Sequence, residues 1–181
     1  MEKIIKLHDK CFRPFIPYER LEKAIDVVAD KLNKDYEGAE DVPVLLCTLN
    51  GAIMFTSELM KRLTFQVELS CIKLSSYQGT RTTGTVLTML GLTSEITGRR
   101  VIICEDIVDT GNTILALQEM LQDKGAAEVR ICTMLLKPDV YDKDVKLDYV
   151  AMEIPNEFIV GFGLDYNEIG RNLKDIYILE K

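Results

Sequence analysis

The stretch from Val101 to Ala116 constrains the fold of this chain more than any other part of the sequence. It opens with a run of apolar, mostly β-branched residues, Val101 to Cys104, which is typical of a strand buried on both faces of a parallel sheet. Two acids end the run and a loop of small residues follows. The next apolar residues recur at helical spacing: Ile114, Leu117 and Leu121. This order of strand, loop and helix predicts an α/β fold.

The loop between this strand and its helix has the chemistry of an anion site. A helix that starts after such a loop offers unpaired backbone N–H groups and the positive end of its dipole to a phosphate. Gly111 lets the backbone come close, and Thr110 and Thr113 add hydroxyl donors. The preceding acids, Glu105 and Asp106, suit sugar hydroxyls or a divalent cation. Together these groups indicate a phosphorylated sugar.

A plain turn, in which Asp109 and Thr110 only cap the helix, is the alternative reading of the same residues. Capping explains one acid and leaves Glu105 and Asp106 unexplained. Acids at the carboxyl end of a buried parallel strand also lie where open α/β sheets bind their ligands. We therefore favour a ligand site over a structural cap.

Further strands and helices are expected on both sides of this unit. Residues 18–33 show the pattern of an amphipathic helix, and 44–49 that of a second buried strand, followed by a helix that carries Phe55, Leu59 and Leu63. Residues 1–17 are expected to form an edge strand or extended arm that ends in a turn. The remaining predicted strands are 67–74, 85–90, 129–136, 149–153 and a closing strand at 176–179.

Three polar segments each have a functional and a structural interpretation. Residues 50–52 end a strand and offer a second set of backbone donors for a phosphate, or form a plain turn. Residues 75–84 are rich in hydroxyls and bounded by glycine, as in a lid that excludes water, or in an inert hairpin tip. Lys137 ends a strand at the same sheet edge as the acids, or is a solvated surface lysine.

Composition narrows the class of protein. The 181 residues suit one domain, and the net charge of −7 works against nonspecific attraction to nucleic acid. No apolar run approaches the roughly 20 residues that span a bilayer, and the charged start does not look like a secretory signal. Five cysteines without a C-x-x-C pair, with four in apolar strand-like runs, indicate buried free thiols and no metal cluster. We expect a cytoplasmic protein that binds neither nucleic acid nor membrane.

Two motifs resemble a known family. The run EDIVDTG with a threonine two residues later, after an apolar strand, is similar to the phosphoribosyl pyrophosphate signature of type I phosphoribosyltransferases. The later run FIVGFGLDYNE narrows the resemblance to the hypoxanthine-guanine branch, and the similarity covers roughly residues 40–179. The resemblance implies a mostly parallel sheet flanked by helices, with a small hood formed by the terminal segments. No complete dinucleotide fingerprint or Walker A lysine motif competes with it.

The resemblance also implies roles for individual residues. Asp109 to Thr113 would bind the 5′-phosphate and Glu105 and Asp106 the ribose hydroxyls, with Asp109 as catalytic acid/base. Leu49 to Ala52 would take the pyrophosphate through backbone N–H groups, across a cis peptide in many relatives, with Arg171 nearby. The implied residues are, for the phosphoribosyl group, Glu105, Asp106, Asp109, Thr110, Gly111, Asn112 and Thr113; for pyrophosphate, Leu49, Asn50, Gly51 and Arg171; for the lid, Ser76 and Tyr77; for the purine, Lys137, Phe158 and Ile159; and for Mg²⁺, Glu105, Asp106 and Asp165.

The expected reaction is attack of a 6-oxopurine on C1 of phosphoribosyl pyrophosphate. Asn50 and Asn112 replace lysines that are common in the family, and because neither change removes a backbone donor, we expect an effect on affinity rather than on reaction type. The rival hypotheses are a transferase for xanthine or another base, and a non-catalytic regulator that senses the sugar pyrophosphate. Such a regulator would be expected to carry a basic surface or an added domain. Members of the hypoxanthine-guanine branch are usually homodimers or homotetramers, so the resemblance implies one of these assemblies.

Overall fold

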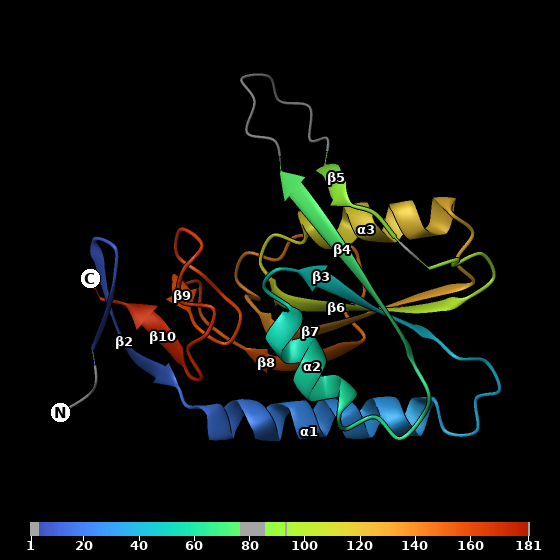
Figure 1. The fold of residues 1–181 in the computed structure, drawn as a ribbon, viewed down its shortest axis with the longest axis horizontal. Coiled ribbons are helices and arrows are strands. Elements are labelled where there is room, and N and C mark those ends of the chain that lie inside the picture. The colour runs from blue at the N-terminus through green and yellow to red at the C-terminus, as the bar shows by residue number, and fades with distance from the viewer. Residues whose placement is uncertain (1–3, 77–85, 93, 181) are drawn as a thin grey trace.

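The computed structural model describes residues 4–76, 86–92 and 94–180, which form two sheets and three helices (Figure 1). The helices are α1 (Tyr18–Asp35), α2 (Ile53–Met60) and α3 (Asn112–Asp123). The strands are β1 (Ile5–Leu7), β2 (Lys10–Ile16), β3 (Val44–Leu49), β4 (Glu68–Ser76), β5 (Val86–Leu90), β6 (Arg100–Val108), β7 (Glu128–Leu136), β8 (Tyr149–Glu153), β9 (Ile159–Val160) and β10 (Ile176–Leu179).

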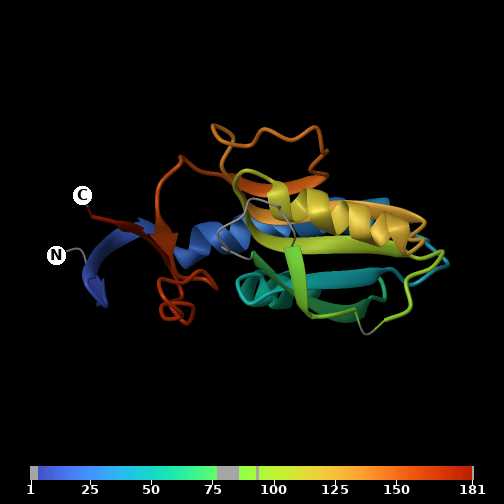
Figure 2. The same ribbon diagram turned by 90° about the horizontal axis from the view of Figure 1, so that it is seen from above.

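The main sheet has the order β5-β4-β3-β6-β7-β8, with five parallel strands and an antiparallel β5 at one edge. Helices α1 and α2 cover one face and α3 covers the other (Figures 1 and 2). Alternate residues of the central strands serve the two faces, as the period of two requires. Leu45 and Ile102 pack with the helix α1 side, whereas Leu46 and Ile103 pack with the helix α3 side. This confirms the predicted α/β class.

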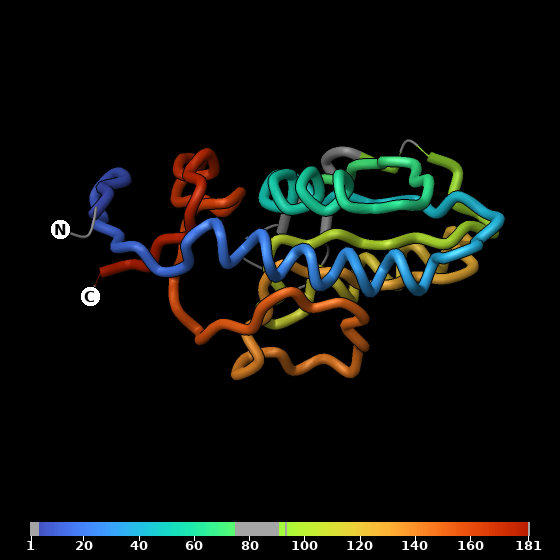
Figure 3. Tube along the Cα trace, turned by 90° about the horizontal axis from the view of Figure 1, so that it is seen from below, coloured from blue at the N-terminus to red at the C-terminus, as the bar shows by residue number. Residues whose placement is uncertain are grey.

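A second sheet forms the predicted hood from the two ends of the chain. Its order is β1-β2-β10-β9, and all of its pairs are antiparallel. It lies at one end of the main sheet (Figures 1 and 3). Its residues Ile16, Ile159 and Ile176 share one apolar cluster with Leu45 and Ile102 of the main sheet. The hood is therefore packed onto the body of the molecule.

The prediction that acids end the central strand was wrong. Strand β6 runs on to Val108, with Glu105 paired to Thr133 and Ile107 to Leu135 of β7. Backbone pairing with a long neighbour continues across the two acids, because the ladder needs only their main-chain groups. The acids consequently sit on the pleated strand itself, where the backbone holds their direction.

The N-terminal prediction also needs correction. Strand β1 does lie at the edge of the hood sheet, as expected, but residues 10–16 form a second strand, β2, which lies between β1 and β10. Pro14 lacks the N–H that an inner strand normally donates, and the pairing opposite it is irregular, with a register shift between Ile176 and Tyr177. Helix α2 ends at Met60, so Leu63 follows it in a turn instead of belonging to it.

All five cysteines are free thiols, as predicted. Three of them, Cys47, Cys104 and Cys132, are buried, while Cys71 and Cys11 are only partly covered. Within the part of the chain that the structure describes, no helix is long and apolar enough to cross a membrane.

Candidate active site

Four segments meet at the carboxyl edge of the main sheet. They are the turn after β3, the acids near the end of β6, the loop that leads into α3, and the residue after β7. Parallel strands bring these segments together because their carboxyl ends share one edge. The hood adds a fifth, the chain between β9 and β10.

A pair of buried carboxyl groups lies at the centre of this edge. Glu105 is 8% exposed, and its Oε2 has no hydrogen-bond partner in the described part of the chain. Burial raises the pKa of Glu105 well above its usual value, and repulsion from Asp106 adds to the rise. Burial also raises the pKa of Asp106, although a bond from the Ile107 N–H to Asp106 Oδ1 at 3.0 Å opposes it. Such costly groups point to a ligand that satisfies them.

The pyrophosphate loop predicted after β3 packs directly on these acids. A Cβ at Gly51 would lie 1.6 Å from Asp106 Oδ2, so only glycine fits there. Gly163, from the hood, has φ +99, and a Cβ on it would lie 2.0 Å from the Gly51 carbonyl oxygen. The peptide bond between Leu49 and Asn50 is cis, as the family resemblance implies.

Arg171 contacts two residues of the hood segment that packs on the Gly51 turn. Its guanidinium donates to the Gly163 carbonyl at 2.9 Å and pairs with Asp165 Oδ1 at 2.7 Å. The other oxygen of Asp165, Oδ2, accepts the Glu168 N–H at 2.8 Å. The structure thus brings the predicted Arg171 and Asp165 together, and Gly163 joins them to the Gly51 turn.

Lys137 is not a solvated surface lysine. It is 8% exposed, and its Nζ lies 3.4 Å from Asp109 Oδ2 and 3.3 Å from Asn156 Oδ1. Its backbone N–H donates to the Val108 carbonyl, which ties the residue after β7 to the end of β6. In chemical terms, an ammonium can donate to an oxygen and a carboxylate can take up a proton.

The sequence did not single out Asn156, which shares Lys137 with Asp109. Residues 154–157 have the composition of a turn, and only the path of the chain after β8 brings its amide to the lysine. No local spacing signals that contact.

The loop before α3 is open for an anion. The N-cap of α3 is Gly111, in the left-handed region at φ +82, and no side chain caps the helix. This observation counts against Asp109 or Thr110 acting as a cap. Thr110, Asn112 and Thr113 are exposed.

Two residues beside that loop were missed by the sequence reasoning. A Cβ at Gly111 would lie 2.5 Å from the Tyr141 ring and 2.9 Å from Lys143 Cγ. Lys143 therefore places a cation near the loop in which Asn112 replaces the lysine common in the family. The segment after β7 has no regular pattern that predicts this contact.

Two of the residues predicted to bind the purine, Phe158 and Ile159, differ in their exposure. Phe158 is 44% exposed, with its ring 5.8 Å from that of Tyr166 in an edge-on arrangement and 6.2 Å from that of Phe12. Ile159, in contrast, is 6% exposed and belongs to the core through β9. Its side chain is not brought to the site. Of the lid residues, Ser76 ends β4 and Tyr77 lies outside the described residues.

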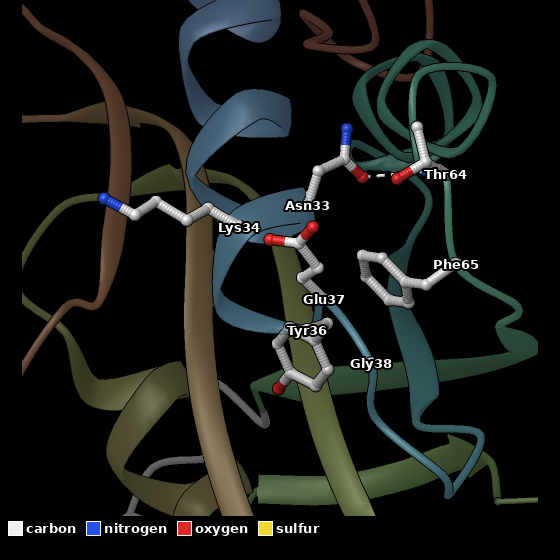
Figure 4. A pocket seen from close by; sticks show the side chains of 7 residues that line it. All are labelled: Asn33, Lys34, Tyr36, Glu37, Gly38, Thr64 and Phe65. Carbon is white, nitrogen blue, oxygen red and sulfur yellow. Dashed lines mark hydrogen bonds between the residues drawn. The ribbon is translucent and has the colours of Figure 1, made fainter.

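A separate cavity of about 360 Å³ lies far from these residues (Figure 4). The cavity opens between the end of α1 and the segment after α2. These segments lead into the starts of β3 and β4, so the cavity lies at the amino edge of the main sheet, opposite the carboxyl edge that holds the candidate site. Its lining residues are Asn33, Lys34, Tyr36, Glu37, Gly38, Thr64 and Phe65. None of the predicted site residues lines it.

Comparison with known proteins identifies close relatives. The phosphoribosyl transferase domain family model matches residues 17–167. Hypoxanthine-guanine phosphoribosyltransferase of Streptococcus thermophilus is 42% identical over 155 residues, 85% of each chain. The enzyme of that name from Streptococcus pneumoniae is 38% identical over 176 residues, 97% of each chain.

Solved structures give the same result. A hypoxanthine phosphoribosyltransferase from Staphylococcus aureus superposes with a TM-score of 0.86 at 36% identity, covering 92% of this chain and 90% of that one. A hypoxanthine-guanine phosphoribosyltransferase from Bacillus anthracis gives a TM-score of 0.87 at 32% identity, covering 98% of this chain and 100% of that one.

Proposed function

The chain belongs to the phosphoribosyl transferase domain family, and from that membership we propose that it is a hypoxanthine-guanine phosphoribosyltransferase of purine salvage. In this reaction the purine attacks C1 of phosphoribosyl pyrophosphate, and a nucleoside 5′-monophosphate and pyrophosphate leave. The relatives reported above carry the name of this enzyme. Their names therefore do not favour the two rival hypotheses, a sugar-pyrophosphate sensor and a transferase for another base.

The observation that carries the proposal is the contact between Lys137 and Asp109. A 6-oxopurine presents an acceptor oxygen and, on the adjacent ring, the N7 proton that must leave during transfer. The Lys137 ammonium donates to the oxygen, and Asp109, 3.4 Å away, takes the proton as general base. A base with an amino group at this position would place a donor against the almost buried ammonium and offer it no acceptor.

The phosphate end of the substrate fits the loop before α3. The uncapped first turn of the helix and the close approach at Gly111 supply backbone donors for the 5′-phosphate, and the Thr110 and Thr113 hydroxyls are exposed to add further donors. Asn112 contributes its backbone N–H in the same turn, while Glu105 and Asp106 accept from the ribose hydroxyls. The sugar is thereby held with C1 between this loop and the base.

The pyrophosphate is assigned to Leu49, Asn50, Gly51 and Arg171. The turn of Leu49 to Gly51 lies against Asp106 and would offer its backbone N–H groups there, and Arg171 is tied to the same place through Gly163. Phe158 offers an exposed ring face to stack on the purine. The next residue, Ile159, is buried in the core and so anchors the backbone beside Phe158. Ser76 and Tyr77 remain the proposed lid that excludes water.

The acids also fit Mg²⁺, which the family implies. Glu105 has an unpartnered buried oxygen, and Asp106 and Asp165 add two further carboxylates, of which Asp165 pairs with Arg171. In the described ranges no cluster of three or more acidic, histidine or cysteine side chains forms a metal cage. Mg²⁺ usually binds through one or two carboxylates plus substrate phosphates, so such a cage is not required. When bound, the ion offsets negative charge that accumulates on the departing pyrophosphate.

Product formation from phosphoribosyl pyrophosphate and Mg²⁺ with hypoxanthine, guanine, xanthine and adenine tests the proposal. We expect turnover with hypoxanthine and guanine, and none with adenine, whose 6-amino group cannot accept from Lys137. Lys137→Met, which keeps an unbranched side chain one atom shorter and removes the charge, should raise the KM for the purine far more than the KM for the sugar pyrophosphate. No turnover with any of the four bases would contradict the assignment.

Assembly and location belong to the same proposal. We infer a homodimer or homotetramer acting in the cytoplasm, supported by the free thiols and by the fit to relatives with this activity. Light scattering of the purified protein gives the subunit number directly. A stable monomer with full activity would contradict the proposed homodimer or homotetramer.

A further inference from the structure

Four cysteines form a row across the main sheet that their sequence spacing does not reveal. In the strand registers, Cys71 of β4 lies opposite Cys47 of β3, Cys47 opposite Cys104 of β6, and Cys104 opposite Cys132 of β7. Residues in register on parallel strands project to the same face. The four thiols therefore stand side by side on adjacent strands.

The row lies under helix α2, on the face where Cys104 and Cys132 join the apolar cluster of α1. Thr56 of α2 is 3% exposed, and its hydroxyl has no hydrogen-bond partner in the described part of the chain. Burial raises the pKa of Cys47 to about 12, and the neighbouring Thr56 hydroxyl acts in the opposite direction on both Cys47 and Cys104. The result is a row of thiols that is buried at Cys47, Cys104 and Cys132 and partly exposed at Cys71.

The geometry of the row rules out two common uses of cysteine. In-register Cβ atoms are separated by about the strand spacing, ~4.8 Å, whereas a disulfide needs about 3.8 Å. A structural Zn²⁺ needs four ligands that converge tetrahedrally, and thiols in a row do not converge. Consistently, no three metal-binding side chains of the described ranges surround a common point.

We propose that Cys71 and Cys47 bind one soft, thiophilic metal ion that takes two ligands in a line, with Hg(II), Ag(I) and Cu(I) as the chemical class. Two parallel thiols at the strand spacing can hold such an ion between them, and thiolates favour soft metals. Cys71 is partly exposed and admits the ion, while the buried Cys47 receives it.

The charge of the site decides which ion of this class binds best. Each thiol loses its proton to solvent as its S–metal bond forms, and no electron is transferred. Two thiolates with one divalent Hg(II) are neutral overall, which suits a site without water. The same pair with monovalent Ag(I) would carry one negative charge unless one thiol keeps its proton. Hg(II) therefore releases two protons, and Ag(I) releases one.

The thiol pair is directly connected to the active site. Cys47 is followed by Thr48, whose hydroxyl donates to the Cys104 carbonyl at 2.8 Å, and then by the Leu49 to Gly51 turn. An ion between Cys71 and Cys47 is bound two residues before this turn. We therefore expect inhibition of the transferase, and this consequence alone rests on the proposed function.

The test has two parts. Proton release is followed with a pH indicator while the reduced full-length protein, freed of reductant, is titrated with HgCl₂; retention of the bound ion is then followed by native mass spectrometry as 2-mercaptoethanol is added in a separate competition. The first equivalent of Hg(II) should bind to one site and release two protons. Cys71→Ser, with Cys71→Ala as a second variant, should lose that ion at a competing thiol concentration about 100-fold lower than wild type, since the chelate is gone.

Cys11→Ser and Cys132→Ala are the matched controls, and both should hold the first ion as wild type does. Retention of that ion by both Cys71 variants would overturn the proposal, and so would its loss in either control. Metal binding as predicted, in a protein that transfers no phosphoribosyl group, would support the thiol site while contradicting the proposed function.

Discussion

At the scale of single residues, Gly51 has the tightest packing in the site. Gly51→Ala places a methyl group 1.6 Å from Asp106 Oδ2, so either the turn or the acid must move. We expect a loss of about 1–3 kcal/mol in the free energy of unfolding and of most transferase activity. Gly91→Ala is the control, because no atom of the residues that the structure describes lies within 4 Å of its added methyl. Equal behaviour of the two variants in urea unfolding and in activity would contradict this account of the turn.

Lys143 is the residue we expect to replace the missing lysine of the phosphate loop. Its stem lies beside Gly111, and its Nζ pairs with Asp142 at 2.6 Å. Lys143→Ala should raise the KM for phosphoribosyl pyrophosphate about tenfold, since a hydrogen bond to a charged group contributes about 1.5–3 kcal/mol. Steady-state kinetics measures it, with the exposed Lys146→Ala as the control. An unchanged KM would show that Lys143 does not reach the phosphate.

At the scale of elements, the hairpin of β1 and β2 holds the segment that carries Phe158 and Asp165. The Tyr166 hydroxyl donates to Asp9 Oδ1 at 2.7 Å, and the Tyr166 ring lies against Phe158 at 5.8 Å. Tyr166→Phe should raise the KM for the purine about threefold to tenfold, the range expected for one hydrogen bond, and leave that for the sugar pyrophosphate unchanged.

A double-mutant cycle assigns this effect to the bond itself. Asp9→Ala should reproduce the change seen in Tyr166→Phe, and the double variant should add nothing further. Additive effects of the two substitutions would mean that the hairpin acts through other contacts, such as the His8 bond to the Asn167 carbonyl at 3.2 Å.

The local pattern of apolar and polar residues was sufficient to predict most helices and strands, and the functional groups in the loop before α3. The runs at 44–49 and 129–136 became β3 and β7, and the loop before α3 followed from its own residues. Pattern failed where pairing with a neighbour decides the outcome, as in the extension of β6 through Glu105 and in the inner position of β2. Asn156 and Lys143 could not be found either, because their contacts depend on how irregular segments fold back.

At the scale of the whole molecule, we propose that residues 1–181 form one domain. The hood shares the cluster of Ile16, Ile159 and Ile176 with Leu45 and Ile102 of the main sheet, so neither sheet has a complete core alone. Thermal unfolding followed by circular dichroism and by tyrosine fluorescence should give coincident transitions. Two separated transitions would show that the hood unfolds independently.

The account as a whole depends on proton transfer at Asp109, held beside Lys137 at the carboxyl edge of the sheet. The most direct test is single-turnover formation of inosine 5′-monophosphate from hypoxanthine by wild type and Asp109→Asn, with sugar pyrophosphate binding measured on the same samples. We predict a rate at least about 100-fold lower in the variant, the usual contribution of a general acid or base, with binding little changed. An unchanged rate in Asp109→Asn would contradict the account.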